Sequence, residues 1–288
     1  MTKSANRNWG RLGVIVLVAA TMSACGMFAR PRSSTEDVQV INNVRYWSGE
    51  GRDERQVLDI YVPRNGKNWP TAVIVHGGAW VTGGKRYMGN IGYALAENGI
   101  AAVCINYRLS PEYRHPAHVT DVARAIAWTK KNLPKYGADT KKLFLVGHSA
   151  GGHLVALVSV KEKYLRDQGL SNNDIAGVMP ISGVYEIDTD VLEPVFGSDR
   201  EKWKDASPIR FVDKGDPPFM ILFADHEMKG AIPLVRQAEE FYQELRDAGV
   251  EVSIHEIGGT NHNTIVGQVG KSNSQTLRLL LRFIDEHS

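Results

Sequence analysis

One serine lies between glycines at the end of an apolar run. Ser149 is the central residue of "GHSAG" (147–151), with a glycine two positions away on each side. A serine that attacks a carbonyl must be lifted off its strand by a sharp turn, where flanking side chains would collide. A helix after the serine would point its N-terminus at the same place and favour an anion there. Ser149 is therefore the candidate nucleophile.

A glycine-rich turn upstream offers hydrogen-bond donors for such a reaction. "HGGAW" (76–80) follows the apolar run "TAVIV". Acyl transfer places negative charge on the former carbonyl oxygen, and backbone N–H groups aimed at that oxygen stabilise it. We expect the N–H groups of Gly78, Ala79 and Ala150 to form this oxyanion hole. Trp80 is expected either to line the acyl pocket or to pack inside the protein.

A serine hydroxyl needs a neighbouring base to take its proton, and the chain has nine histidines. His262 lies in "GGTNHNTI" (258–265), after the last expected strand and before the final expected helix. His255 falls inside an expected strand, and His148 and His153 flank the serine too closely. His262 is therefore the candidate base.

The imidazole in turn needs a carboxylate to fix its tautomer and stabilise its charge. The chain order nucleophile, acid, histidine places that acid after the run "FMILF". The segment "ADHEMKG" (224–230) offers Asp225 and Glu227. Asp225 is also typical of a turn residue that bonds nearby backbone. The residue pattern alone leaves both candidates open.

These residues require elements that bring them to one edge of a sheet. Continuous apolar runs alternate with segments of helical periodicity, which predicts an α/β fold with a mostly parallel sheet covered by helices on both faces. The expected strands are 55–62, 70–78, 100–107, 142–147, 175–183, 217–225 and 250–259, and the expected helices are 88–99, 117–137, 233–249 and 274–287.

The chain has 288 residues and is 43% hydrophobic, enough for one large domain, which we place at 38–288. Residues 184–216 break the alternation with a mixed, charged and aromatic segment. We expect this segment to be a lid over a pocket or a surface excursion. The net charge of +2 argues against a nucleic-acid partner.

Four motifs together carry a family resemblance: "HGGAW", "INYRLSP" (105–111), "GHSAGG" (147–152) and "GGTNHNTI". In this order they resemble the HGGX-type esterase branch of the α/β-hydrolase fold, from about residue 38 to the end. "HGGAW" is similar to the motif of kynurenine formamidases and isoprenylcysteine methylesterases. Most relatives have a third glycine where this chain has Ala79, but alanine keeps the N–H donor.

The resemblance also bears on the acid. Relatives carry Gly-x-x-Asp after the corresponding strand, with the Asp catalytic. Setting Ala224 on that glycine puts Glu227 on the catalytic position. The resemblance therefore favours Glu227 over Asp225.

The resemblance implies a carboxylic ester hydrolase (carboxylesterase) that cleaves small to medium esters through an acyl-enzyme, without a cofactor. Alternatives are an aryl formamidase, a polysaccharide acetyl or feruloyl esterase, and an inactive envelope scaffold that only binds. The pair of histidines in "HPAH" (115–118) has no acidic or cysteine partner beside it. We therefore expect no metal site, and the oligomeric state stays open.

The first residues predict export. A basic stretch, a short apolar run and small residues over 1–24 are typical of a signal peptide. The run ends in "MSAC", which resembles the lipobox of bacterial lipoproteins and implies acylation of Cys25. Residues 25–37 would form a tether. We expect a membrane-anchored lipoprotein of the bacterial envelope, in the outer membrane and facing the periplasm.

Overall fold

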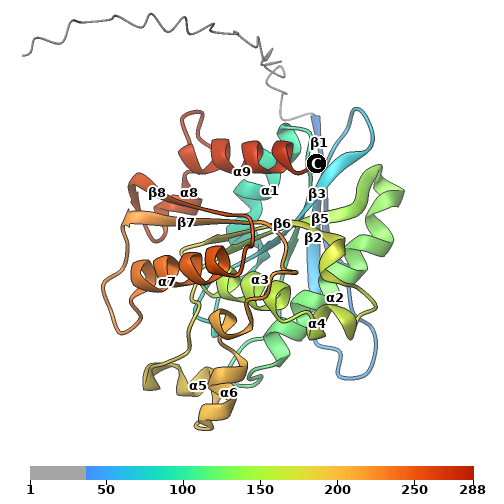
Figure 1. The fold of residues 1–288 in the computed structure, drawn as a ribbon. Helices are drawn as coiled ribbons and strands as arrows, with labels where there is room; N and C mark the ends of the chain where they lie inside the picture. The colour runs from blue at the N-terminus through green and yellow to red at the C-terminus, as the bar shows by residue number, and fades with distance from the viewer. Residues whose placement is uncertain (1–36) are drawn as a thin grey trace, which may run out of the picture. The chain divides into compact units, whose positions relative to one another are not determined.

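A computed structural model describes residues 37–288. The expected signal peptide, Cys25 and all of the tether except Asp37 lie outside this range. Eight strands form a single sheet in the order β1-β2-β4-β3-β5-β6-β7-β8 (Figure 1). The strands are β1 (Val38–Arg45), β2 (Val57–Pro63), β3 (Trp69–Val75), β4 (Ala101–Ile105), β5 (Ala138–His148), β6 (Ile175–Ile181), β7 (Phe219–His226) and β8 (Val252–Asn261).

The sheet is mostly parallel, as predicted. β2 runs antiparallel to both of its neighbours, β1 and β4. From β4 to β8 every neighbouring pair is parallel. With the helices on its two faces, this arrangement is the α/β-hydrolase fold, and the predicted fold class is confirmed.

β1 is a strand that the sequence pattern missed. Its register against β2 shifts between Ile41 and Val44. Only Val38 of this edge strand is buried, so its sequence does not carry the apolar alternation that marks a half-buried strand.

Helices cover both faces of the sheet (Figure 1). α1 and α9 pack with one set of strand side chains, and α2, α3 and α7 pack with the other. The longer helices are α1 (Gly89–Glu97), α2 (Ala117–Asn132), α3 (Ala150–Val160), α7 (Leu234–Asp247) and α9 (Gln275–Glu286). The short ones are η2 (Lys85–Met88), η3 (Leu133–Tyr136), α4 (Lys163–Arg166), η4 (Asn172–Asp174), η5 (Asp190–Leu192), α5 (Glu193–Phe196), α6 (Arg200–Asp205), η6 (Pro208–Phe211) and α8 (Thr264–Gly267).

Strand β3 explains why the apolar runs are continuous. Val73 and Val75 pack in the cluster that includes α2 and α3. Ala72 and Ile74 point to the other face and pack with α1 and α9. A strand in the middle of a doubly covered sheet buries every side chain, so its sequence does not alternate.

Residues 184–216 fold into the short helices η5, α5, α6 and η6, near the side of the sheet that α3 and α7 cover (Figure 1). Phe196 and Trp203 anchor this segment, and both side chains are buried. The segment is thus packed onto the domain through its aromatic residues.

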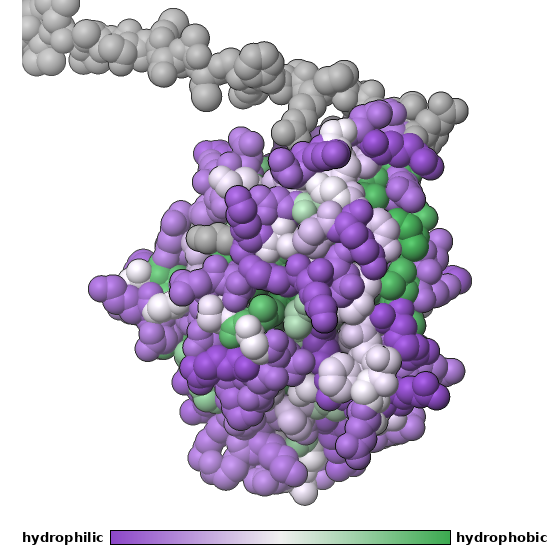
Figure 2. Space-filling model, turned by 90° about the vertical axis from the view of Figure 1, so that its right-hand side faces the viewer, coloured by the Kyte–Doolittle hydropathy of each residue, from purple (hydrophilic) through white to green (hydrophobic). Residues whose placement is uncertain are grey.

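Hydrophilic side chains cover most of the face seen in Figure 2, and apolar groups form small patches there. Within residues 37–288, no helix has the length and apolar character to cross a membrane. Cys104 of β4 is a free, fully buried cysteine whose thiol donates to the carbonyl of Met88 at 3.4 Å.

Candidate active site

Ser149 occupies a sharp turn between β5 and α3. Its backbone has φ 54° and ψ −118°, outside the conformations that most residues adopt. Its N–H donates to the carbonyl of Ile181 at 2.8 Å, and its carbonyl accepts from His153 at 3.0 Å. These bonds hold a strained backbone in place, which is a recurrent property of functional sites.

The glycines around Ser149 are required by close backbone contacts. A Cβ at Gly147 would lie 2.2 Å from the carbonyl oxygen of Gly151. A Cβ at Gly151 would lie 2.2 Å from the carbonyl oxygen of Val75, at the end of β3. The turn can therefore form only because both side chains are missing.

The "HGGAW" turn lies directly against the serine. A Cβ at Gly77 would be 3.0 Å from the Cβ of Ser149. Gly78, Ala79 and Trp80 all have positive φ, at 115°, 50° and 60°. Among the described residues, no group accepts a hydrogen bond from the N–H of Gly78 or Ala79. These two donors are therefore available to a ligand beside Ser149.

The side chain of Trp80 is buried behind the turn. Its Nε1–H donates to Nδ1 of His153 at 3.2 Å, and its ring meets Phe196 edge-on at 5.1 Å. His153 Nε2–H donates to the carbonyl of Ala206 at 2.7 Å, so both ring nitrogens are engaged. Of the two roles expected for Trp80, the structure shows packing, since only 1% of the residue is exposed.

His262 and Glu227 form a buried pair. Nδ1–H of His262 donates to Oε1 of Glu227 at 2.5 Å, and the two side chains are 7% and 4% exposed. Burial alone would raise the pKa of Glu227, but the hydrogen bond and the charge of His262 lower it to about 2. Glu227 is therefore a carboxylate that fixes the tautomer of His262 and leaves Nε2 as the proton acceptor.

Asp225, the alternative acid, contacts the backbone before His262. Its carboxylate accepts from the N–H groups of Gly259 and Thr260 at 2.7 and 2.9 Å. It also pairs with exposed His226 at 2.9 Å, and this bond is the main cause that lowers its pKa to about 2. The structure thus brings Glu227 to His262 and uses Asp225 to hold the loop that carries His262.

His148 links His262 to the turn that carries Ser149. Its Nε2–H donates to the carbonyl of His262 at 2.7 Å, and the two rings lie 4.8 Å apart. Burial lowers the pKa of His148 to about 4, so the ring is neutral and can act as this donor. Because His148 directly precedes Ser149, this bond places His262 at the same edge of the sheet.

The sequence pattern assigns no role to His148 and His153, because both flank the serine. Their roles depend on partners more than 50 residues away, which no local pattern reveals. One signal was present for His153: the i, i+4 spacing from Ser149 puts both residues on one face of a helix.

No group of three or more His, Cys, Asp or Glu side chains within residues 37–288 is arranged to hold a metal ion.

The fold and the site define the class: this is an α/β-hydrolase fold with a serine on a strained turn and a buried histidine–carboxylate pair. Residues 58–245 match the family described as BD-FAE, which covers more than half of the chain. The chain therefore belongs to the BD-FAE family.

Individual relatives agree with this assignment. Esterase LipC of Mycobacterium tuberculosis is 33% identical, over 74% of this chain and 58% of LipC. Kynurenine formamidase of Danio rerio is 27% identical, over 88% of this chain and 84% of that enzyme. The chain spans about half the length of the first mycobacterial esterases it matches.

Solved structures share the fold. The crystal structure of esterase B from Lactobacillus rhamnosis superposes with a TM-score of 0.74 at 24% identity, over 87% of this chain and 86% of esterase B. At this identity the likeness shows the fold.

Proposed function

We propose that the protein is a carboxylic ester hydrolase that cleaves small to medium esters through an acyl-enzyme on Ser149. The observation that carries the proposal is the buried hydrogen bond between His262 and Glu227, at the sheet edge that presents Ser149 on a strained turn. The esterases among its relatives support the same reaction.

The proposed reaction begins when Nε2 of His262 takes the proton of the Ser149 hydroxyl as its oxygen attacks the ester carbonyl. Negative charge then develops on the carbonyl oxygen. The N–H groups of Gly78, Ala79 and Ala150 receive it, where each well-placed donor is worth about 3 kcal/mol. His262 next protonates the leaving alcohol, and the acyl group stays on Ser149.

The second half of the reaction releases the acid. A water molecule gives its proton to His262 and attacks the acyl carbonyl. The intermediate collapses, His262 returns the proton to Ser149, and the carboxylic acid leaves. Glu227 stays ionised throughout and stabilises the imidazolium.

The test is hydrolysis of p-nitrophenyl acetate, butyrate and octanoate by the full chain, beside Ser149→Ala. We expect ester turnover in the wild type and its loss in the variant. The dependence of turnover on acyl chain length will measure the size of the acyl pocket. If the wild type and the variant are equally inert, the protein is a binding scaffold and the proposal fails.

A second candidate activity is hydrolysis of an aryl formamide. The match to kynurenine formamidase supports it, because it extends over 84% of that enzyme. N-formylkynurenine in the same assay separates the two, since a formamidase turns it over faster than any of the three esters. The same catalytic residues would serve, with an amine as the leaving group.

We further propose that the protein is exported and anchored to the bacterial outer membrane through an acylated Cys25. The lipobox-like "MSAC" supports this location. More than one acyl chain would hold the protein stably on a membrane.

A further inference from the structure

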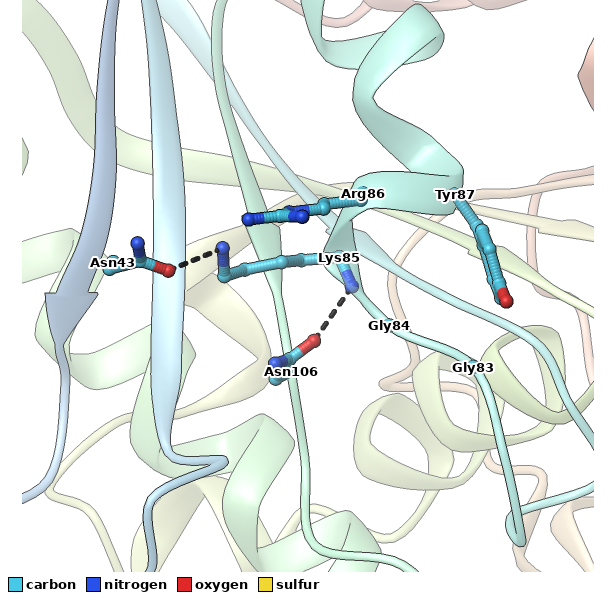
Figure 3. A pocket seen from close by; sticks show the side chains of 7 residues that line it. All are labelled: Asn43, Gly83, Gly84, Lys85, Arg86, Tyr87 and Asn106. Carbon is cyan, nitrogen blue, oxygen red and sulfur yellow. Dashed lines mark hydrogen bonds between the residues drawn. The ribbon is translucent and has the colours of Figure 1, made fainter.

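A cavity of about 360 Å³ lies beside the segment that connects the "HGGAW" turn to α1 (Figure 3). This volume is within the range of roughly 300–1,000 Å³ in which proteins bind small ligands. None of the proposed catalytic residues lines it. The lining residues are Asn43, Gly83, Gly84, Lys85, Arg86, Tyr87 and Asn106.

A buried ion pair forms one side of this cavity. Nζ of Lys85 lies 2.7 Å from both carboxylate oxygens of Asp59 and 2.9 Å from Oδ1 of Asn43. Lys85 and Asp59 are only 4% and 2% exposed. The three protons of the ammonium group are therefore engaged, and its charge is balanced by Asp59.

The two amide side chains turn their oxygens to Lys85. Oδ1 of Asn43 accepts from Nζ of Lys85, and Oδ1 of Asn106 accepts from its backbone N–H at 2.7 Å (Figure 3). Among the described residues, neither amide nitrogen has a hydrogen-bond partner. The amides therefore offer donors to the cavity while their acceptors are occupied.

Arg86 adds a cation without a counter-charge. The residue is exposed, and its guanidinium has no ion pair or hydrogen bond with any residue of 37–288. Its side chain runs beside that of Lys85 toward Asn43 (Figure 3). Two cations and one carboxylate leave this cavity with a positive charge, and the exposed ring of Tyr87 supplies a flat apolar surface.

We propose that this cavity binds a small anion, a carboxylate or a phosphate, through the guanidinium of Arg86 and the amide N–H groups of Asn43 and Asn106. A guanidinium matches the two oxygens of a carboxylate or phosphate with parallel hydrogen bonds. The site lies outside the proposed catalytic residues, and its ligand binding does not depend on the proposed function.

The test is isothermal titration calorimetry on the full chain with D-glucuronate, with D-glucose as the neutral match and with inorganic phosphate. We expect an anion to bind at least about tenfold more tightly than glucose, because charge-assisted hydrogen bonds are about twice as strong as neutral ones. Binding should weaken as salt is added, since Arg86 is exposed. If phosphate displaces glucuronate, the site recognises the negatively charged oxygens and not the sugar ring. If glucuronate binds and phosphate does not, the ligand is a carboxylate.

Two variants locate the binding. Arg86→Gln removes the free cation, and Asn43→Asp keeps the acceptor for Lys85 while replacing a donor with a negative oxygen. Each should weaken anion binding about tenfold or more. Arg64 is an exposed arginine outside the cavity, so Arg64→Gln should leave anion binding unchanged. Thermal unfolding of each variant checks that it is folded. The proposal is overturned if the wild type binds neither anion, if glucose binds equally well, or if both variants bind as the wild type does.

Discussion

At the scale of single residues, two carboxylates two positions apart bind different partners. Glu227 accepts a buried hydrogen bond from His262, and Asp225 binds the backbone of Gly259 and Thr260. We expect Glu227→Gln to lower kcat by roughly 10³- to 10⁴-fold, because a neutral amide neither fixes the tautomer of His262 nor stabilises its charge. Steady-state hydrolysis of p-nitrophenyl butyrate measures this change in kcat.

The matched control is Asp225→Asn, which should reduce kcat far less and act through the stability of the loop before His262. Equal losses in the two variants would mean that Asp225 shares the role of the acid.

The low pKa of Glu227 also makes stability depend on pH. Its folded value is about 2 and its ordinary value 4.5, so ionised Glu227 stabilises the fold above about pH 4.5. That contribution is lost as the pH falls through about 2. The difference in unfolding free energy between the wild type and Glu227→Gln should therefore narrow between about pH 6 and pH 3 in urea titrations. A difference that stays constant over this interval would contradict the link between the lowered pKa and stability.

The proposed catalytic residues come from residue type, chain order and family resemblance. Of Ser149, His262 and Glu227, the structure brings His262 and Glu227 into contact. The choice between Asp225 and Glu227 needed the resemblance, because both follow the same strand. His148 and His153 could not be assigned, since their partners are set by the fold.

At the scale of elements, the "HGGAW" turn depends on helix α3 for its shape. Ala79 and Trp80 both have positive φ, which costs on the order of 1–3 kcal/mol each. The bond from Trp80 to His153 holds the turn in this form. We expect Trp80→Phe to lower kcat about tenfold with little change in KM, because misplaced donors weaken only the transition state.

The control is the double variant of Trp80→Phe with His153→Phe. If the bond between the two side chains determines kcat, His153→Phe lowers kcat less in the Trp80→Phe variant than it does in the wild type. A fall in Tm with unchanged kcat would show that the pair only stabilises the fold.

The element boundaries show where sequence patterns are informative. Strands buried on both faces, such as β3 and β6, appear as continuous apolar runs and were predicted. β1 was missed because it is an edge strand with little buried surface. The segment 184–216 could not be assigned from its pattern, because its short helices are held by tertiary contacts of Phe196 and Trp203.

At the scale of the whole molecule, the N-terminal segment should decide in which compartment the protein lies. Acylation of Cys25 predicts that the protein fractionates with membranes and needs detergent for release. Cys25→Ser should either release the protein into the soluble fraction or leave its signal peptide uncleaved. The ester activity of the folded domain should be unchanged. Membrane fractionation and the mass of the mature N-terminus check this. A wild-type N-terminus without a lipid would contradict the proposed anchor.

The position of Cys104 has a practical consequence for the folded domain. Cys104 is the fourth of the five residues of β4. None of its surface is open to solvent, and burial raises the pKa of its thiol well above the ordinary value. A thiolate is the form that reacts with oxidants and alkylating reagents. The folded domain should therefore withstand an oxidising compartment without a reductant. It can also carry a single engineered surface cysteine for a fluorophore without removal of its own.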